Sequence, residues 1–431
     1  MQTNDGLHSL NREEIVPGIS LTCITTDKFK TGCITINLLC KLSRDTASSL
    51  TLIPRILRRG SKDHPNMEAI SAALDNLYGA RIEPLNRKKG EMQCIGLFAD
   101  FPDDRYLPDN KAILEDTIGL LGEMLINPSL IDGEFNLDYV TGEKSNLIDD
   151  IKAAINDKRG YAVDRLLEEM CPDEAYGVSK LGTEESVKAI TPKSLTDLYN
   201  NIISNAKIEI FYCGAASPKR VKAALLSSLS KLPARPGAKI PETKIIYTPK
   251  NDAPRTITEE MDVTQGKLTM GFRVGQVMQN PNYPALIMFN SIYGGSVTSK
   301  LFTNVREKLS LCYYASSMLD KHKGIMLVAS GVEFDKYEMA KDEIFHQLDL
   351  VKRGEISDFE FEAAKKYVVS SIKTAMDRLG GLEELYFDSI VSAAPYVPLD
   401  ICDNINNVTC EQVSEIAKSI NAELIYFLTG K

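Results

Sequence analysis

The chain has 431 residues and a formal charge of -9, with 43% apolar and 25% charged residues. These values are typical of a soluble globular protein of two or more domains, and they exclude wholesale disorder. The acidic balance argues against nucleic acid as a main partner, and the sequence has no run of about 18 apolar residues that could cross a membrane.

The first segment, 1–17, is polar and carries acidic residues, which is not the pattern of a secretion signal. The nine cysteines form no CxxC pair. We therefore expect buried free thiols, a reducing compartment and a cytoplasmic location. Five of the cysteines lie inside apolar runs, namely Cys23, Cys33, Cys40, Cys94 and Cys213.

The first half of the chain reads as two strands, two helices, a hairpin, two long helices, and a last helix that leads into a strand. Strands are assigned by short apolar runs between turn residues, and helices by apolar residues at helical spacing. The predicted elements cover residues 20–26, 32–42, 47–58, 67–77, 91–101 after a turn at 87–90, 111–125, 134–156, 191–203 and 208–214.

A proline-rich and lysine-rich segment follows at 232–254. Such a composition predicts an extended, solvated linker between domains. Beyond it, the same order of elements returns. The second set is predicted at 255–261, 267–274, 283–292, 299–308, 325–332 after a turn at 321–324, 336–353, 358–379, 409–420 and 423–427.

The two halves also share a register. The run Leu52-Ile53 to Gly60 matches Leu286-Ile287 to Gly294, and the same offset carries Gly90 onto Gly324. A fixed offset across helix, turn and strand indicates a duplication. We therefore predict an α+β protein with two homologous sandwich domains, 1–231 and 255–431, each a mixed or antiparallel sheet with helices packed on one face.

The search for catalytic chemistry finds few histidines, and none has a metal-ligand partner at helical spacing. His8, His64 and His322 are expected to be surface residues without a catalytic role, and His346 is equally isolated. The chain also lacks GxSxG, phosphate-loop and GxGxxG motifs. The four histidines therefore do not predict a metal site.

The most distinctive segment is 294–314, which reads GGSVTSKLFTNVREKLSLCYY. It resembles the stretch GGGxxSRLFxx(V/L)REKxxLxY in the second half of the insulinase, pitrilysin and mitochondrial processing peptidase family of zinc peptidases, including the spacing from Arg306 to Tyr313. The length, the duplication and the order of elements fit the same family. The resemblance implies one half of a clamshell-shaped peptidase.

Catalytic chains of that family carry an inverted zinc motif, H-x-x-E-H, and a third acidic ligand on a later helix. The corresponding positions are Thr51, Pro54 and Arg55, with Glu143 or Asp150 on the later helix. A hydroxyl is a poor zinc ligand, a guanidinium is a fixed cation, and proline has no acidic group. We therefore expect a degenerate site with no metal or cofactor in this chain.

The resemblance assigns Arg306 and Tyr313 to substrate binding and to stabilisation of the oxyanion at the scissile bond, with Gly295 beside them in substrate binding. The implied function is that of a non-catalytic, peptide-binding subunit of a heterodimeric zinc metallopeptidase. Its partners would be a homologous chain with an intact H-x-x-E-H, which carries the zinc, and a short unfolded peptide.

Other interpretations remain open. By composition alone Arg306 reads as a solvated charge and Tyr313 as sheet packing. The chain could instead be a structural or binding protein, similar to the peptidase-derived core subunits of a respiratory complex; a peptidase with another metal site is disfavoured, because the histidines are few and scattered.

A basic cluster at the end of the first long helix is a solvated helix end or, alternatively, a contact for an acidic peptide. It consists of Arg55, Arg58, Arg59 and Lys62. In the family, an edge strand near the zinc site pairs with the peptide. The sequence does not show whether strand 91–101 or strand 325–332 has a free edge.

Overall fold

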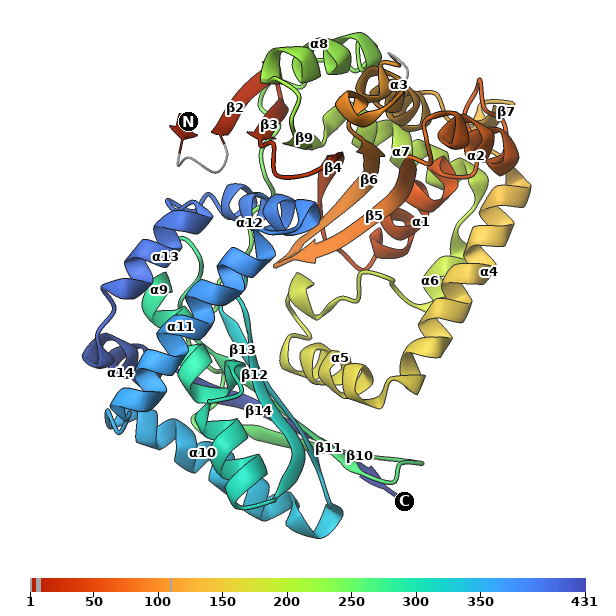
Figure 1. Cartoon of the computed structure of the whole chain (residues 1–431). Coiled ribbons are helices and arrows are strands. Elements are labelled where there is room, and N and C mark those ends of the chain that lie inside the picture. Colours follow the sequence, from red (N-terminus) through yellow and green to blue (C-terminus); the bar gives the residue numbers. More distant parts are fainter. Residues whose placement is uncertain (1, 5–8, 109–110) are drawn as a thin grey trace. The chain divides into compact units, whose positions relative to one another are not determined.

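The computed structural model describes residues 2–4, 9–108 and 111–431 (Figure 1). His8 lies outside the described residues. Within the described part, no helix combines the length and the apolar character needed to cross a bilayer.

The chain forms two compact units, and each is built mainly from one half of the sequence. Each unit also contains one segment from the other half, which the predicted boundaries 1–231 and 255–431 do not include. Unit 1 comprises Met1–Lys152, Val178–Glu242 and Arg378–Phe387, and unit 2 comprises Ala153–Gly177, Thr243–Asp377 and Asp388–Lys431.

Unit 1 contains a seven-stranded mixed sheet in the order β1-β2-β3-β9-β4-β6-β5. All neighbouring strands pair antiparallel except β3 and β9, which are parallel. The strands are β1 Gln2–Asn4, β2 Ser9–Val16, β3 Ile19–Thr25, β4 Thr31–Lys41, β5 Arg81–Lys89, β6 Met92–Pro102 and β9 Lys207–Gly214; a separate pair joins β7 Leu130–Ile131 to β8 Glu134–Phe135.

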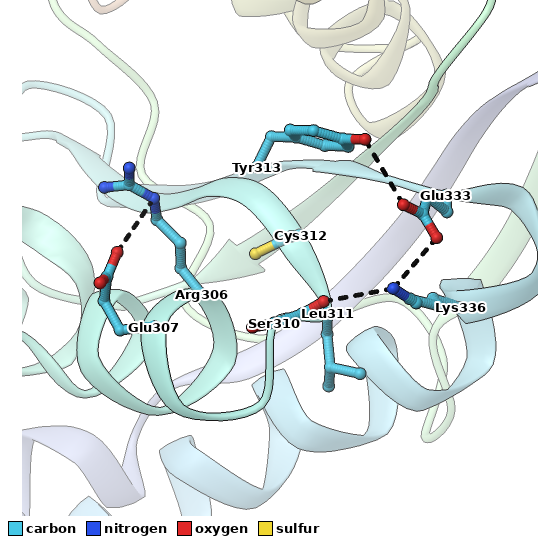
Figure 2. Close-up of a pocket in the computed structure, with 8 residues that line it drawn as sticks. All are labelled: Arg306, Glu307, Ser310, Leu311, Cys312, Tyr313, Glu333 and Lys336. Carbon is cyan, nitrogen blue, oxygen red and sulfur yellow. Dashed lines mark hydrogen bonds and ion pairs between the residues drawn. The ribbon is translucent and has the colours of Figure 1, made fainter.

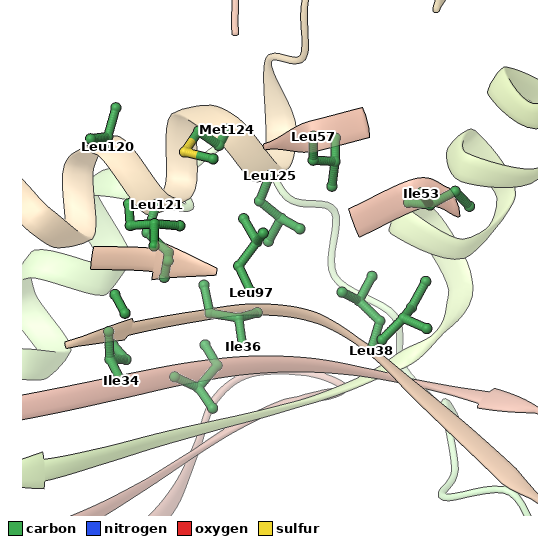
Figure 3. Packing of buried hydrophobic residues seen from close by; sticks show 14 of the residues in the cluster. Ile34, Ile36, Leu38, Ile53, Leu57, Leu97, Leu120, Leu121, Met124 and Leu125 are labelled. Atoms are coloured by element: carbon green, nitrogen blue, oxygen red, sulfur yellow. The ribbon is translucent and has the colours of Figure 1, made fainter. Parts of the chain in front are cut away.

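Helices cover one face of this sheet, because alternate residues of its strands are large and apolar. Figure 3 shows the side chains of Ile34, Ile36 and Leu38 meeting those of two helices above them. Burying each such side chain contributes about 1.5–3 kcal/mol. The helices of this unit are α1 Ala47–Leu57, α2 Met67–Asn76, α3 Ile113–Ile126, α4 Leu137–Ala153, α6 Glu184–Ala189, α7 Pro192–Asn205 and α8 Pro218–Ser228.

The start of α12 (Leu379–Val391) packs on the opposite face of this sheet. Thr35 donates a hydrogen bond of 2.9 Å to Glu383, and Arg87 forms an ion pair of 2.8 Å with the same carboxylate. The rings of Phe211 and Phe387 meet edge to face at 5.5 Å. Burial raises the pKa of Glu383 above its usual value, despite the neighbouring guanidinium.

Unit 2 repeats the topology with five strands, in the order β10-β14-β11-β13-β12. This order matches β3-β9-β4-β6-β5 strand for strand, including the parallel pair β10–β14. The strands are β10 Arg255–Met261, β11 Gly266–Arg273, β12 Cys312–Asp320, β13 Ile325–Val332 and β14 Asn421–Gly430.

One face of the second sheet packs against α9 and the later helices, and the other against α5 through Leu166 and Met170. The predicted α+β fold is therefore confirmed, with one helix added on the second face of each sheet. The helices are α5 Lys158–Met170, α9 Tyr283–Asn290, α10 Tyr337–Lys352, α11 Asp358–Ala375, α13 Pro398–Asn406 and α14 Cys410–Lys418.

The topology also answers the question of free edges. Strands β6 and β13, which correspond to 91–101 and 325–332, are interior strands with a neighbour on each side. The outer strands at these ends of the sheets are β5 and β12, each of which is the first strand of its hairpin. Pro84 lies in β5, in keeping with the confinement of proline to edge strands.

The proline-rich segment 232–254 forms neither helix nor strand. Its expected solvation is wrong at the beginning, where Arg235 is buried. The guanidinium of Arg235 donates to the carbonyl oxygens of Pro233 and Ala206, and its backbone N–H donates to Pro17. These carbonyl partners compensate the buried cation, so the segment is packed against unit 1 where it starts.

Unit 2 contains a buried network of four charges. Glu174 pairs with Arg273 at 2.6 Å and with Lys323 at 2.7 Å, and Arg273 also pairs with Glu423. Burial alone would raise the pKa of Glu174, but the hydrogen bonds from Arg273 and Lys323 hold it below its usual value. The carboxylate therefore stabilises the folded chain at neutral pH.

We expect Glu174→Gln to lower the free energy of unfolding by about 3–5 kcal/mol, because it leaves two buried cations short of a counter-charge. In the wild type, the contribution of Glu174 should be present above pH 4.5, the ordinary pKa of the carboxyl, and disappear as the pH falls through the lower native pKa. Urea titrations at several pH values measure both effects. Glu168→Gln, on an exposed residue of α5, should cost little; an equal loss in both variants would contradict the role of the network.

Candidate peptide-binding site and degenerate metal site

The segment that resembles the peptidase family contains two π-helical stretches. After α9, residues Ser291–Gly295 and then Leu301–Lys308 form π-helices, where the sequence predicted helices ending at 292 and spanning 299–308. The second closes with a wide turn, in which Leu309 N–H donates to the carbonyl of Asn304. Such widened turns are frequent at functional sites because they redirect side chains.

Residues of this segment and of the stretch just before α10 line a pocket of about 410 Å³ (Figure 2). The pocket brings together the π-helix, the beginning of β12 and the short 3-10 helix Phe334–Lys336. Its lining residues are Arg306, Glu307, Ser310, Leu311, Cys312, Tyr313, Glu333 and Lys336.

Arg306 and Tyr313, the predicted pair, both line this pocket. The side chain of Arg306 is 40% exposed, lies 4.6 Å from the ring of Phe302 and reaches Glu307 at 3.4 Å. Tyr313 is 62% exposed. The guanidinium of Arg306 therefore pairs only with a residue that also lines the pocket in the described part of the chain, and it remains accessible to a ligand.

The polar ends of the pair point in different directions (Figure 2). The hydroxyl of Tyr313 donates to Glu333 at 3.4 Å, and Glu333 forms an ion pair of 3.0 Å with Lys336. A hydrogen bond from the ammonium of Lys336 to this carboxylate raises the pKa of the lysine. The motif spacing did not predict Glu333 or Lys336, because they follow β13 and reach the pocket only through strand pairing.

Gly295 lies outside the set of residues that line the pocket. A glycine is needed here because the backbone passes close to Asn290. A Cβ at this position would lie 2.5 Å from the side-chain nitrogen of Asn290. The structure thus brings Arg306 and Tyr313 to one pocket and does not bring Gly295 to it.

The degenerate zinc positions lie on α1 and α4. One salt bridge joins the two helices there, and a second joins α4 to the turn that follows α1. Arg55 pairs with Asp150 at 2.8 Å, and Arg59 pairs with Glu143 at 2.5 Å. These ion pairs bring the acidic residues of α4 next to the altered positions. In this chain, however, each carboxylate faces a guanidinium.

The other two altered positions are equally unsuited to a metal. Thr51 is buried, donates to the carbonyl of Ala47, and accepts hydrogen bonds from Asn86 at 2.8 Å and Gln93 at 3.2 Å. Pro54 lies inside α1, which continues to Leu57. No cluster of three potential metal ligands occurs among the described residues. This donor set does not fit zinc.

The basic cluster at the end of α1 also has partners. Arg55 and Arg59 are paired as above, and Arg58 donates to the carbonyl of Ile82 at 2.6 Å. Carboxylates therefore pair two of the three guanidinium groups, whereas Arg58, within the described residues, has a carbonyl partner only for its Nε. A binding role for this cluster toward acidic peptides gains no support from these contacts, and Lys62 is the exposed member of the four.

The prediction that His322 is a surface residue is wrong. Its side chain is only 7% exposed and lies between Asp388, at 3.0 Å from Nε2, and Ser392, at 2.7 Å from Nδ1. Asp388 lies in the last turn of α12 and Ser392 directly follows this helix, so both partners are distant from His322 in the sequence. His64 is half-buried and meets Glu123 at 3.1 Å.

Comparison with known proteins identifies the fold and the family. Residues 189–368 match the family model described as "Peptidase M16 inactive domain". The chain is 32% identical over 413 residues, 96% of each chain, to "Probable inactive metalloprotease YmfF" of Bacillus subtilis strain 168. The "Uncharacterized zinc protease YmxG" of the same organism is 24% identical over 296 residues, covering 67% of this chain and 69% of that one.

The crystal structure of a conserved protein from Enterococcus faecalis V583 superposes with a TM-score of 0.89 at 27% identity, covering 98% of this chain and 99% of that one. The match to YmfF over nearly the whole chain and the missing zinc ligands both indicate an inactive member of a peptidase family. The chain belongs to the M16 peptidase family, to which the segment 294–314 pointed, and it is an inactive member of that family.

Proposed function

We propose that this chain is the non-catalytic, peptide-binding subunit of a two-chain zinc peptidase. The observation that carries the proposal is the contrast between two sites: Arg306 and Tyr313 line an open pocket, whereas guanidinium groups fill the degenerate metal site. The partner would be a homologous chain with an intact H-x-x-E-H. In support, the relatives from Bacillus subtilis include one named a probable inactive metalloprotease and one named an uncharacterized zinc protease.

The chemistry of the pocket suits peptide hydrolysis in trans. A tetrahedral intermediate places negative charge on the former carbonyl oxygen, and preorganised donors at that oxygen lower the barrier. The guanidinium of Arg306 supplies charge-assisted donors and the phenol of Tyr313 supplies one more. The metal and the base that activates water would come from the partner.

An extended peptide is the substrate class that this pocket favours. The pocket opens at the start of β12, an outer strand of its sheet, and outer strands can pair with an extended segment. We also place the protein in the cytoplasm, since all nine cysteines are free thiols and eight of them are buried.

The purified chain should contain no stoichiometric zinc and should not cleave peptides. Added zinc or a chelator should leave its unfolding midpoint unchanged, since only a ligand that binds the folded state shifts that midpoint. Metal analysis and thermal unfolding provide the measurements. A tightly bound transition metal in the isolated chain would contradict the proposal.

The two salt bridges to the carboxylates of α4 should differ in strength. Arg59→Met should cost about 1–3 kcal/mol of unfolding free energy, because the carboxylate of Glu143 is only 9% exposed and loses its partner. Arg55→Met should cost less than about 1 kcal/mol, since the carboxylate of Asp150 is 52% exposed and stays hydrated. Urea denaturation compares them, and the reverse order would contradict this explanation.

In the complex co-purified from the native host, Arg306→Ala or Tyr313→Phe should lower peptide turnover by about 10²-fold, the scale for losing one oxyanion donor. Arg353→Ala and Tyr367→Phe are matched controls on exposed residues of unit 2 and should leave turnover unchanged. Normal turnover in both test variants, with the complex intact, would remove the proposed role and leave a structural one.

A further inference from the structure

The position of Tyr313 is set by an irregularity at the start of β12. Cys312 pairs with Val332 and Tyr314 pairs with Gly331, so that Tyr313 is an extra residue without a partner in β13. This is a β-bulge, a device that turns a side chain out of the regular alternation, often next to a functional site. Ser310, two residues before β12, adopts a left-handed backbone with φ of 51°.

Tyr313 also contacts the residue that follows β13. Cys312 lies opposite Val332, and the unpaired Tyr313 after Cys312 reaches Glu333, the residue after Val332. Glu333 accepts the hydroxyl of Tyr313 at 3.4 Å and is held by Lys336 at 3.0 Å. Lys336 also donates to the carbonyl of Ser310 at 3.4 Å, which closes a ring of contacts around the bulge.

These contacts set up a competition for one proton. A phenol has a single O–H and donates to one acceptor at a time. In the free chain that acceptor is Glu333, and Figure 2 shows the hydroxyl directed to Glu333 while the guanidinium of Arg306 points elsewhere. The phenol cannot donate to a peptide oxygen beside Arg306 while it donates to Glu333.

We propose that Glu333, braced by Lys336, is a positioning residue that holds Tyr313 in a resting orientation, and that a bound peptide must displace this contact to recruit the phenol. The inference rests on the proposed function of the pocket and adds a resting state to it. Binding of the peptide then includes the loss of one hydrogen bond, which weakens affinity without changing the later chemical step.

The resting contact can be tested in the isolated chain. With tyrosine labelled at Cζ with carbon-13, the Tyr313 signal is assigned by its loss in Tyr313→Phe. Glu333→Ala should shift this signal. Glu338→Ala is the matched control, because Glu338 forms the same kind of i,i+3 pair with Lys341 without a tyrosine hydroxyl, and it should leave the signal unchanged. An unshifted Tyr313 signal in Glu333→Ala would overturn the inference.

The kinetic consequence is tested in the co-purified complex with an unstructured peptide. Glu333→Ala should lower KM by about twofold to tenfold, the equivalent of one net hydrogen bond, with kcat unchanged. Glu333→Gln retains an acceptor and should give a smaller change. Damage to the fold would lower kcat and would not improve KM.

The two proposals fail separately. If Tyr313→Phe lowers turnover but Glu333→Ala leaves KM unchanged or raises it, the pocket is functional and the role of Glu333 is wrong. If Arg306→Ala and Tyr313→Phe both retain full turnover, the proposed function itself is wrong.

Discussion

Two salt bridges, from Arg55 on α1 and from Arg59 just after it to carboxylates on α4, limit the chemistry that this chain can perform. A guanidinium stays charged at any physiological pH and offers no lone pair to a metal. Arg55 and Arg59 therefore put two fixed positive charges where catalytic members of the family bind a zinc ion. The acidic residues on α4 are satisfied by these arginines within the same chain. In the proposed function, the metal for hydrolysis belongs to a second polypeptide, and this chain contributes the pocket of Arg306 and Tyr313.

That pocket depends on local backbone geometry more than on the identity of its charges. A π-helix ends in a wide turn, Ser310 takes a left-handed conformation, and a bulge releases Tyr313 from the strand pairing. Each feature alone costs some stability, and together they expose two polar side chains that regular helix and strand geometry would place elsewhere. Glu333 arrives through the pairing of β12 with β13 and gives the phenol a partner inside the protein.

Much of the fold could be predicted from the sequence, because duplication and hydrophobic periodicity are local signals: the matched run before Gly60 and Gly294 corresponds to two sheets with the same strand order. The spacing of Arg306 and Tyr313 likewise anticipated a shared pocket. The π-helices, the burial of His322 between Asp388 and Ser392, and the partner of Tyr313 were not predicted. They depend on hydrogen bonds and contacts between residues distant in sequence, which carry no periodic pattern.

The segment Arg378–Phe387 has a consequence for how the chain is made. Unit 1 already has most of its residues by Glu242, yet the open face of its sheet receives Glu383 and Phe387 only near the end of translation. Until then Phe211 and the polar groups of Thr35 stay uncovered on the nascent polypeptide. Exposed sheet surface promotes non-native association. Unit 1 must therefore stay soluble with one face of its sheet partly uncovered while more than a hundred further residues are synthesised.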